Sequence, residues 1–135
     1  MRLQNYRDLV VWQKAMTLVG GVYRVTGEWP REELFGLTSQ VRRAAVSVPA
    51  NIAEGQGRRA LKEYLHHLAI ANGSLFEVET HLLIAQQLGY SDDATCLALA
   101  GQTSEVGRLL HGLMNSLASL DARNGAKRPA SKTDT

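Results

Sequence analysis

Acidic residues and histidines are the first candidates for chemistry in this chain. Residues 63–66 match the Glu-x-x-His element that supplies ligands in di-iron four-helix bundles. Such a site needs a second copy, and none of the other three histidines lies three residues after a glutamate. Glu77 and His81 stand four residues apart, a spacing typical of a pair on a helix surface. We therefore expect no metal, no cofactor and no enzymatic activity, with a metal enzyme using Glu63 and His66 kept as an alternative.

Other catalytic motifs are not supported by their context. Residues 55–60 follow a Gly-x-Gly-x-x-Ala pattern, but a dinucleotide-binding turn follows a strand, and a helix is predicted here. These glycines are better explained as a helix stop. No serine or cysteine has a histidine and an acid placed by a local motif.

Basic residues suggest a different function, the binding of nucleic acid. Five of them form two groups: Arg42, Arg43, Arg58, Arg59 and Lys62. In a symmetric oligomer they would recur in every subunit and could form a ring that neutralises phosphates, with strong salt dependence. Glu54 and Glu63 lie nearby in the sequence, so the cations could instead be occupied by ion pairs. RNA or DNA binding is one hypothesis, and a protein–protein assembly module with no nucleic-acid binding is the alternative.

Charge is distributed unevenly along the chain. The 135 residues carry 15 Lys and Arg against 13 Asp and Glu, a formal charge of +2. Residues 122–135 hold four basic residues and one acidic residue. Residues 1–121 therefore hold 11 basic and 12 acidic residues, a formal charge of −1. Because residues 122–135 also lack large apolar side chains, we predict a folded domain at 1–121 and a disordered basic tail at 122–135.

Composition indicates one globular domain, with 44% apolar residues. The single cysteine, Cys96, suits a reducing compartment, and we expect the cytoplasm. No apolar run approaches the ~20 residues of a membrane span, so we expect no membrane partner.

Helices must position the candidate residues, because apolar residues recur every three or four positions and nowhere alternate as in a strand. The pattern predicts helices over about 7–26, 32–55, 60–88 and 92–120, with a local kink at Pro49. Short connections make successive helices antiparallel. We predict an all-α, antiparallel up-down-up-down four-helix bundle.

The predicted first helix is apolar on two opposite sides. We assign one side to the core: Leu9, Trp12, Met16, Val19 and Tyr23. We assign the other to an oligomer interface: Val11, Leu18, Val22 and Val25. One bundle core cannot use both sides, so we expect a homo-oligomer.

Two polar residues, Asn72 and Glu79, fall within the predicted apolar stripe of the third helix. We therefore predict that both are buried. A buried carboxylate needs a partner, and the candidates for Glu79 are Arg42, Arg43 and Arg108.

Three blocks of the sequence resemble the 23S ribosomal RNA intervening-sequence protein family. They are residues 5–15 (NYRDLVVWQKA), 35–55 (FGLTSQVRRAAVSVPANIAEG) and 71–82 (ANGSLFEVETHL). The resemblance implies a bacterial four-helix-bundle protein that assembles as a ring-shaped pentamer and has no assigned molecular role. A relative of the family, the accessory variability determinant of diversity-generating retroelements, binds a reverse transcriptase and nucleic acid. The expected partners are therefore other copies of the chain, together with RNA or DNA or another protein.

Overall fold

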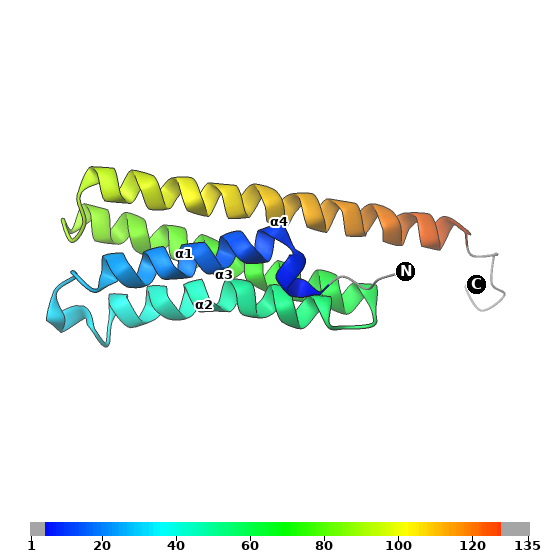
Figure 1. The fold of residues 1–135 in the computed structure, drawn as a ribbon, viewed down its shortest axis with the longest axis horizontal. Helices are drawn as coiled ribbons and strands as arrows, with labels where there is room; N and C mark the ends of the chain where they lie inside the picture. The colour runs from blue at the N-terminus through cyan, green and yellow to red at the C-terminus, as the bar shows by residue number, and fades with distance from the viewer. Residues whose placement is uncertain (1–4, 128–135) are drawn as a thin grey trace.

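Four helices pack side by side in a computed structural model that describes residues 5–127 (Figure 1). They are α1 (Val10–Thr26), α2 (Leu37–Gln56), α3 (Leu61–Gln87) and α4 (Asp93–Lys127). Two short 3-10 helices accompany them, η1 (Tyr6–Asp8) and η2 (Arg31–Glu33). The described residues contain no strand, which confirms the all-α class and the four-helix bundle.

Two helix boundaries differ from the sequence-based prediction. The first helix was predicted to begin near residue 7, but the extended backbone of Leu9 separates η1 from α1. Asn5 caps η1, because its side chain accepts a hydrogen bond from the Arg7 N–H at 2.9 Å. At the other terminus, α4 includes residues 122–127, which we predicted to belong to a disordered tail. The rest of that predicted tail, 128–135, lies outside the described residues.

The core corrects our assignment of the two faces of α1. Val11, Leu18 and Val22 are at most 5% exposed and pack within the chain's own core, and Val25 is partly buried against it. We had predicted that these four residues form an oligomer interface, and this prediction is wrong because they are packed inside the chain's own bundle. The reason is steric: the same side of α1 carries small residues that permit close packing. A Cβ atom at Gly21 would lie 3.0 Å from Leu99 of α4.

Hydrogen bonds join the α1–α2 and α3–α4 connections, which lie at the same end of the bundle (Figure 1). The Trp29 indole donates to the Ser91 hydroxyl at 2.8 Å, and the Tyr90 hydroxyl donates to Glu33 at 2.7 Å. Glu33 also accepts from the Leu37 N–H at 3.1 Å, so it holds the start of α2. We call this the latched end.

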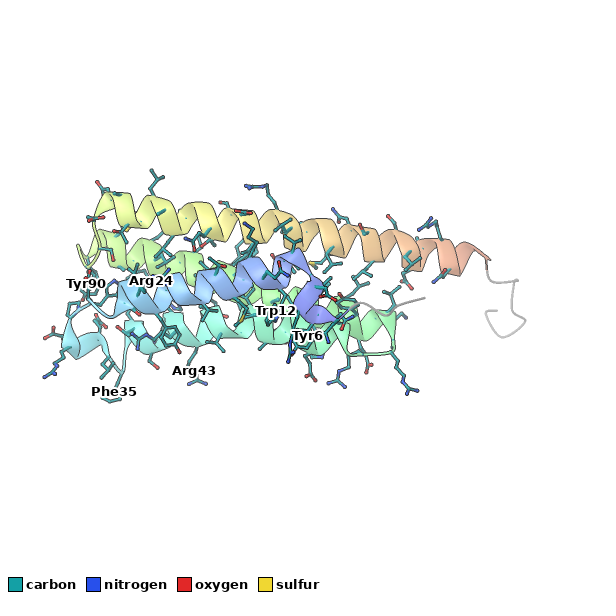
Figure 2. All side chains as sticks on the ribbon, in the orientation of Figure 1. Tyr6, Trp12, Arg24, Phe35, Arg43 and Tyr90 are labelled. Atoms are coloured by element: carbon teal, nitrogen blue, oxygen red, sulfur yellow. The ribbon has the colours of Figure 1, made fainter. Side chains whose placement is uncertain are left out.

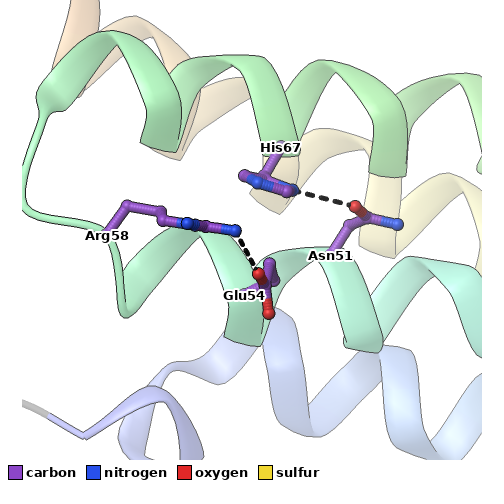
Figure 3. A network of polar contacts seen from close by, with 4 residues as sticks. All are labelled: Asn51, Glu54, Arg58 and His67. Atoms are coloured by element: carbon purple, nitrogen blue, oxygen red, sulfur yellow. Dashed lines mark hydrogen bonds and ion pairs between the residues drawn. The ribbon is translucent and has the colours of Figure 1, made fainter.

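A polar seam joins α2 and α3 toward the opposite end. The Ser74 hydroxyl donates to that of Ser47 at 2.8 Å, and the Asn51 side-chain oxygen lies 3.1 Å from His67 Nδ1 (Figure 3). Gly55 permits the close approach, since a Cβ atom there would lie 2.9 Å from Cβ of His67. Gly55 therefore serves helix packing inside α2, whereas Gly57 is the C-cap at which the helix ends, as predicted.

The length of α4 exceeds that of α3, with 35 residues against 27. At ~1.5 Å per residue the difference is about 12 Å. Figure 1 shows the C-terminal part of α4 continuing past the α2–α3 turn. Among residues 5–127, no helix is both long and apolar enough to cross a membrane.

Candidate assembly face and cationic turn

An apolar groove of about 260 Å³ runs between α1 and α2 on the outside of the bundle. It is lined by Tyr6, Trp12, Met16, Val46, Pro49, Ala50 and Ala53. Met16 and Val46 are 46% and 43% exposed. We call this surface the α1/α2 face. It contains Trp12 and Met16 of α1, which we had assigned to the core. Of that predicted core side, Met16 and Tyr23 are exposed, and the rest is partly buried against the core: Leu9, Trp12 and Val19.

Phe35 is 93% exposed beside the start of α2, where Figure 2 shows its ring pointing away from the bundle. The loop behind it is held in place by the hydrogen bonds of Glu33. Gly36 makes room for that carboxylate, because a Cβ atom at this position would lie 2.8 Å from Glu33 Oε1. Sequence analysis missed Phe35, because no periodicity separates a loop phenylalanine that is exposed from one that is buried.

The five predicted cationic residues do not form one cluster. Arg42 and Arg43 lie in the first half of α2, whereas Arg58, Arg59 and Lys62 lie at the α2–α3 turn. Arg58 follows Arg43 by 15 positions, which correspond to about 22 Å at the rise of an α-helix. The two groups are therefore separate surfaces.

Arg42 is half-buried and makes contacts within its own chain. Its Nε donates to the Thr26 hydroxyl at 2.8 Å, and its guanidinium lies 4.6 Å from the centre of the Tyr23 ring. This is cation–π geometry, which fixes the orientation of the charged group.

Arg43 points out of the bundle (Figure 2) and lines a polar groove of about 420 Å³ between α2 and α3. Glu77 and His81 line the same groove, and the Nδ1 atom of His81 is buried without a hydrogen-bond partner in the described structure. Arg43 forms no ion pair with any residue from 5 to 127.

The α2–α3 turn presents three exposed basic residues, Arg58, Arg59 and Lys62, which we call the cationic turn. Arg58 pairs with Glu54 one helical turn earlier (Figure 3). Arg59 and Lys62 make no ion pair within residues 5–127. The turn therefore offers two unneutralised charges per chain.

The prediction that Asn72 and Glu79 are buried fails for the acid. Asn72 is half-buried, but Glu79 is exposed and forms no ion pair with a described residue. It lies at the edge of α3, where it lines a small groove toward α4 with Leu83 and Cys96. The apolar stripe of α3 is narrower than the sequence suggested, because Phe76 and Leu83 are also exposed.

The positions of the His, Cys, Asp and Glu side chains bear on the metal-enzyme alternative. Within residues 5–127, no group of three or more of them is placed to hold a metal ion. His66 is exposed, and its ring contacts that of His67 at 5.8 Å. Glu63 and His66 therefore lack the further ligands that a di-iron site requires.

Comparison with known proteins identifies the family. The sequence profile of the 23S rRNA-intervening sequence proteins matches residues 7–112. The chain belongs to this family. A crystal structure of a protein with unknown function from the S23 ribosomal protein family of Bacteroides thetaiotaomicron is similar in fold, with a TM-score of 0.73 and 20% identity. The similarity covers 78% of this chain and 96% of that one. No curated protein gives a significant match.

The part of the chain that matches the intervening-sequence proteins includes α1, α2, α3 and more than half of α4. The α1/α2 face from Trp12 onward, Phe35 and the cationic turn all lie within residues 7–112. The solved relative is described as having unknown function, so a role for this intervening-sequence protein has to come from its own surfaces.

Proposed function

We propose that this intervening-sequence protein is a non-enzymatic scaffold that assembles into a homo-oligomer through its α1/α2 face. The observation that carries the proposal is Phe35, a large apolar side chain that is 93% exposed on a loop fixed by hydrogen bonds. Aromatic side chains in such positions are typical anchors of protein interfaces. The apolar groove on the same chain supplies a surface that can receive one.

The anchor and the groove cannot meet within one subunit. At ~1.5 Å per residue, Pro49 lies about 20 Å along α2 from Gly36, farther than a phenylalanine side chain extends. Phe35 of one subunit would therefore enter the groove of the next. This contact is heterologous, and heterologous contacts build closed rings or open filaments. The pentameric ring implied by the family resemblance is one closed form.

Sedimentation velocity tests the assembly. We expect the wild-type chain to sediment as an oligomer at micromolar concentration, and Phe35→Ser and Met16→Glu to shift it toward the monomer with unchanged helical circular dichroism. Leu97→Ser is the matched control, because Leu97 is 76% exposed on α4, away from this face. A monomeric wild type, or equal effects of Phe35→Ser and Leu97→Ser, would contradict the proposal.

Nucleic-acid binding is a second candidate function, favoured by the unpaired Arg59 and Lys62 at the cationic turn. Assembly would repeat the turn in every subunit and raise the local positive charge. We expect affinity for structured RNA or duplex DNA to fall steeply with salt.

Fluorescence anisotropy with both nucleic acids at several salt concentrations measures this. The double variant Arg59→Ala/Lys62→Ala should bind at least tenfold more weakly and with a smaller salt slope. Arg108→Ala removes an exposed charge from α4 and serves as the control. Binding that ignores salt, or that survives the double variant, would contradict binding through the cationic turn. The absence of binding to either nucleic acid would leave a protein-assembly module as the remaining function.

A further inference from the structure

A separate pocket of about 210 Å³ lies at the latched end, between the end of α1 and the start of α2. Its polar lining comes from Arg31, Arg42, Thr26 and Thr38, and Leu34 and Trp29 contribute apolar walls. No acidic residue of the described chain lines it. Glu33 belongs to the same loop, but its oxygens accept hydrogen bonds from Tyr90 and from the Leu37 N–H.

Arg42 is held in this pocket without a counter-ion. The Tyr23 ring and the Thr26 hydroxyl fix one side of the guanidinium, and Nη2 donates to the Tyr23 carbonyl oxygen at 3.5 Å. Nη1 remains available as a donor. No ion pair joins Arg42 to any residue from 5 to 127. Charged groups that leave water are normally paired, so a fixed, half-buried arginine with no anion indicates a missing partner.

Thr38 adds a hydroxyl group to the lining of the pocket, from a residue that is only 2% exposed. It lies in the first turn of α2, where the helix dipole also favours an anion. Arg42, Thr38 and the exposed Arg31 thus surround one pocket from three positions in the sequence.

We propose that this pocket binds a phosphate group carried as a monoester or as free inorganic phosphate. Two arginines give the lining a charge of +2, which matches the charge of about −1.5 to −2 on such a group at neutral pH. With Nε on Thr26 and Nη2 on the Tyr23 carbonyl, Arg42 can still offer Nη1 to one phosphate oxygen, and the Arg31 guanidinium can donate to another. A carboxylate carries one negative charge and would leave the lining positive.

A titration of the full chain with inorganic phosphate at constant ionic strength, followed by ¹H–¹⁵N NMR, tests the site. We expect saturable shifts of the Gly27 and Thr38 amides and of the Trp29 indole. Acetate and a nucleoside monophosphate are the comparison ligands. The nucleoside monophosphate should shift the same resonances as inorganic phosphate. Chemical-shift changes that do not saturate with phosphate would overturn the proposal, and so would acetate binding as tight as that of phosphate.

Single substitutions assign the site to these residues. Arg42→Ala and Arg31→Ala should each weaken phosphate binding by roughly tenfold to a hundredfold, because each removes hydrogen bonds to a charged group. Arg31 is exposed, so its loss tests the site even if Arg42→Ala unfolds the chain. Arg43→Ala is the matched control, since Arg43 follows Arg42 in sequence but lines the groove between α2 and α3. An equal effect of Arg43→Ala would show that only diffuse charge attracts the anion.

This site is distinguishable from the proposed assembly function. Phe35 does not line the pocket, so Phe35→Ser should abolish assembly and keep phosphate binding. If Phe35→Ser instead loses phosphate binding, the pocket is completed only in the oligomer. This result would overturn the proposal that one chain contains the whole site.

Discussion

The two ends of the bundle differ in how the chain holds its connections. At the latched end, side-chain hydrogen bonds join the α1–α2 connection to the α3–α4 connection, through Trp29 with Ser91 and Tyr90 with Glu33. At the other end, the α2–α3 turn has one exposed ion pair, between Arg58 and Glu54. The latched end is thus constrained by hydrogen bonds between residues 62 and 57 positions apart, whereas the contacts described near the turn join the successive helices α2 and α3 or lie within α2.

This difference separates the surfaces by the chemistry that each can perform. A fixed end can hold Phe35 and Arg42 in defined orientations, which an anchor or a specific anion pocket requires. A solvated turn with long basic side chains suits binding by charge alone, which tolerates mobile partners. We therefore expect substitutions at the latched end to cost more stability than substitutions at the turn.

The largest effect is expected for Trp29→Ala at the latched end. Trp29 is 6% exposed, packs 6.0 Å from the Tyr90 ring and donates to Ser91. Its truncation should lower the free energy of unfolding by about 3–5 kcal/mol, measured by urea denaturation. Phe35→Ala, in the same connection, should change monomer stability by less than about 0.5 kcal/mol. Similar losses in both variants would mean that the loop is not latched by Trp29.

A close helix contact nearer the turn should give the next largest effect. Gly55→Ala places a Cβ atom 2.9 Å from Cβ of His67, so we expect a loss of about 1–3 kcal/mol from forced separation of α2 and α3. Gly73→Ala is the opposite control in α3, because nothing lies within 4 Å of its Cβ position. It should stabilise the helix by up to about 1 kcal/mol in the same denaturation experiment. If both variants changed the free energy of unfolding in the same direction, the close contact at Gly55 would be contradicted.

A smaller, pH-dependent loss is expected for Tyr90→Phe. The Tyr90 hydrogen bond, followed by that of the Leu37 N–H, lowers the pKa of Glu33 below its usual 4.5. The same bond to Glu33 raises the pKa of Tyr90 above its usual 10.0. Glu33 therefore contributes stability above pH 4.5 that is lost as the pH falls through its lowered pKa, whereas the Tyr90 contribution is lost as the pH rises through its raised pKa.

The difference in melting temperature between wild type and Tyr90→Phe should thus be largest between these limits and shrink toward both extremes. Thermal unfolding followed by circular dichroism across pH measures it. Tyr23→Phe is the control, since Tyr23 is exposed and its hydroxyl makes no hydrogen bond to a described residue. A difference that is independent of pH would argue against the Tyr90–Glu33 bond.

The smallest effect is expected for Arg58→Ala at the turn. Its ion pair with Glu54 is exposed and spans one helical turn, and such pairs contribute about 0.3–0.5 kcal/mol. The loss should disappear in high salt, as tested by urea denaturation with and without added sodium chloride. A loss comparable to that of Trp29→Ala would remove the contrast between the two ends.

Sequence periodicity was sufficient for the helices and for part of the core. In α3, the apolar residues Leu68, Leu75, Val78 and Leu82 recur at helical spacing, and all four are buried. In α1 the same reasoning chose the wrong side, because both sides are apolar and hydrophobicity alone cannot rank them. The side that faces the core is decided by the small residues Ala15 and Gly21. They allow neighbouring helices to approach the side of α1 that carries Leu18 and Val22.

The candidate sites were less predictable than the fold. Arg42 and Arg43 are neighbours in sequence, but successive helical residues point about 100° apart, so one enters a pocket and the other a groove. Phe35 and the latch depend on contacts between residues such as Glu33 and Tyr90, 57 positions apart. No local pattern encodes such a distance.

The overhang of α4 has a practical consequence for labelling. Burial, with Asp93 and Asp92 adding to it, raises the pKa of the Cys96 thiol, and Cys96 is 8% exposed, so it should react slowly with maleimides near neutral pH. Asn124 is exposed on the part of α4 beyond the start of α3. A cysteine introduced there would accept a dye first, so that rotational correlation times could report the size of the assembly from a position away from its proposed contact surfaces.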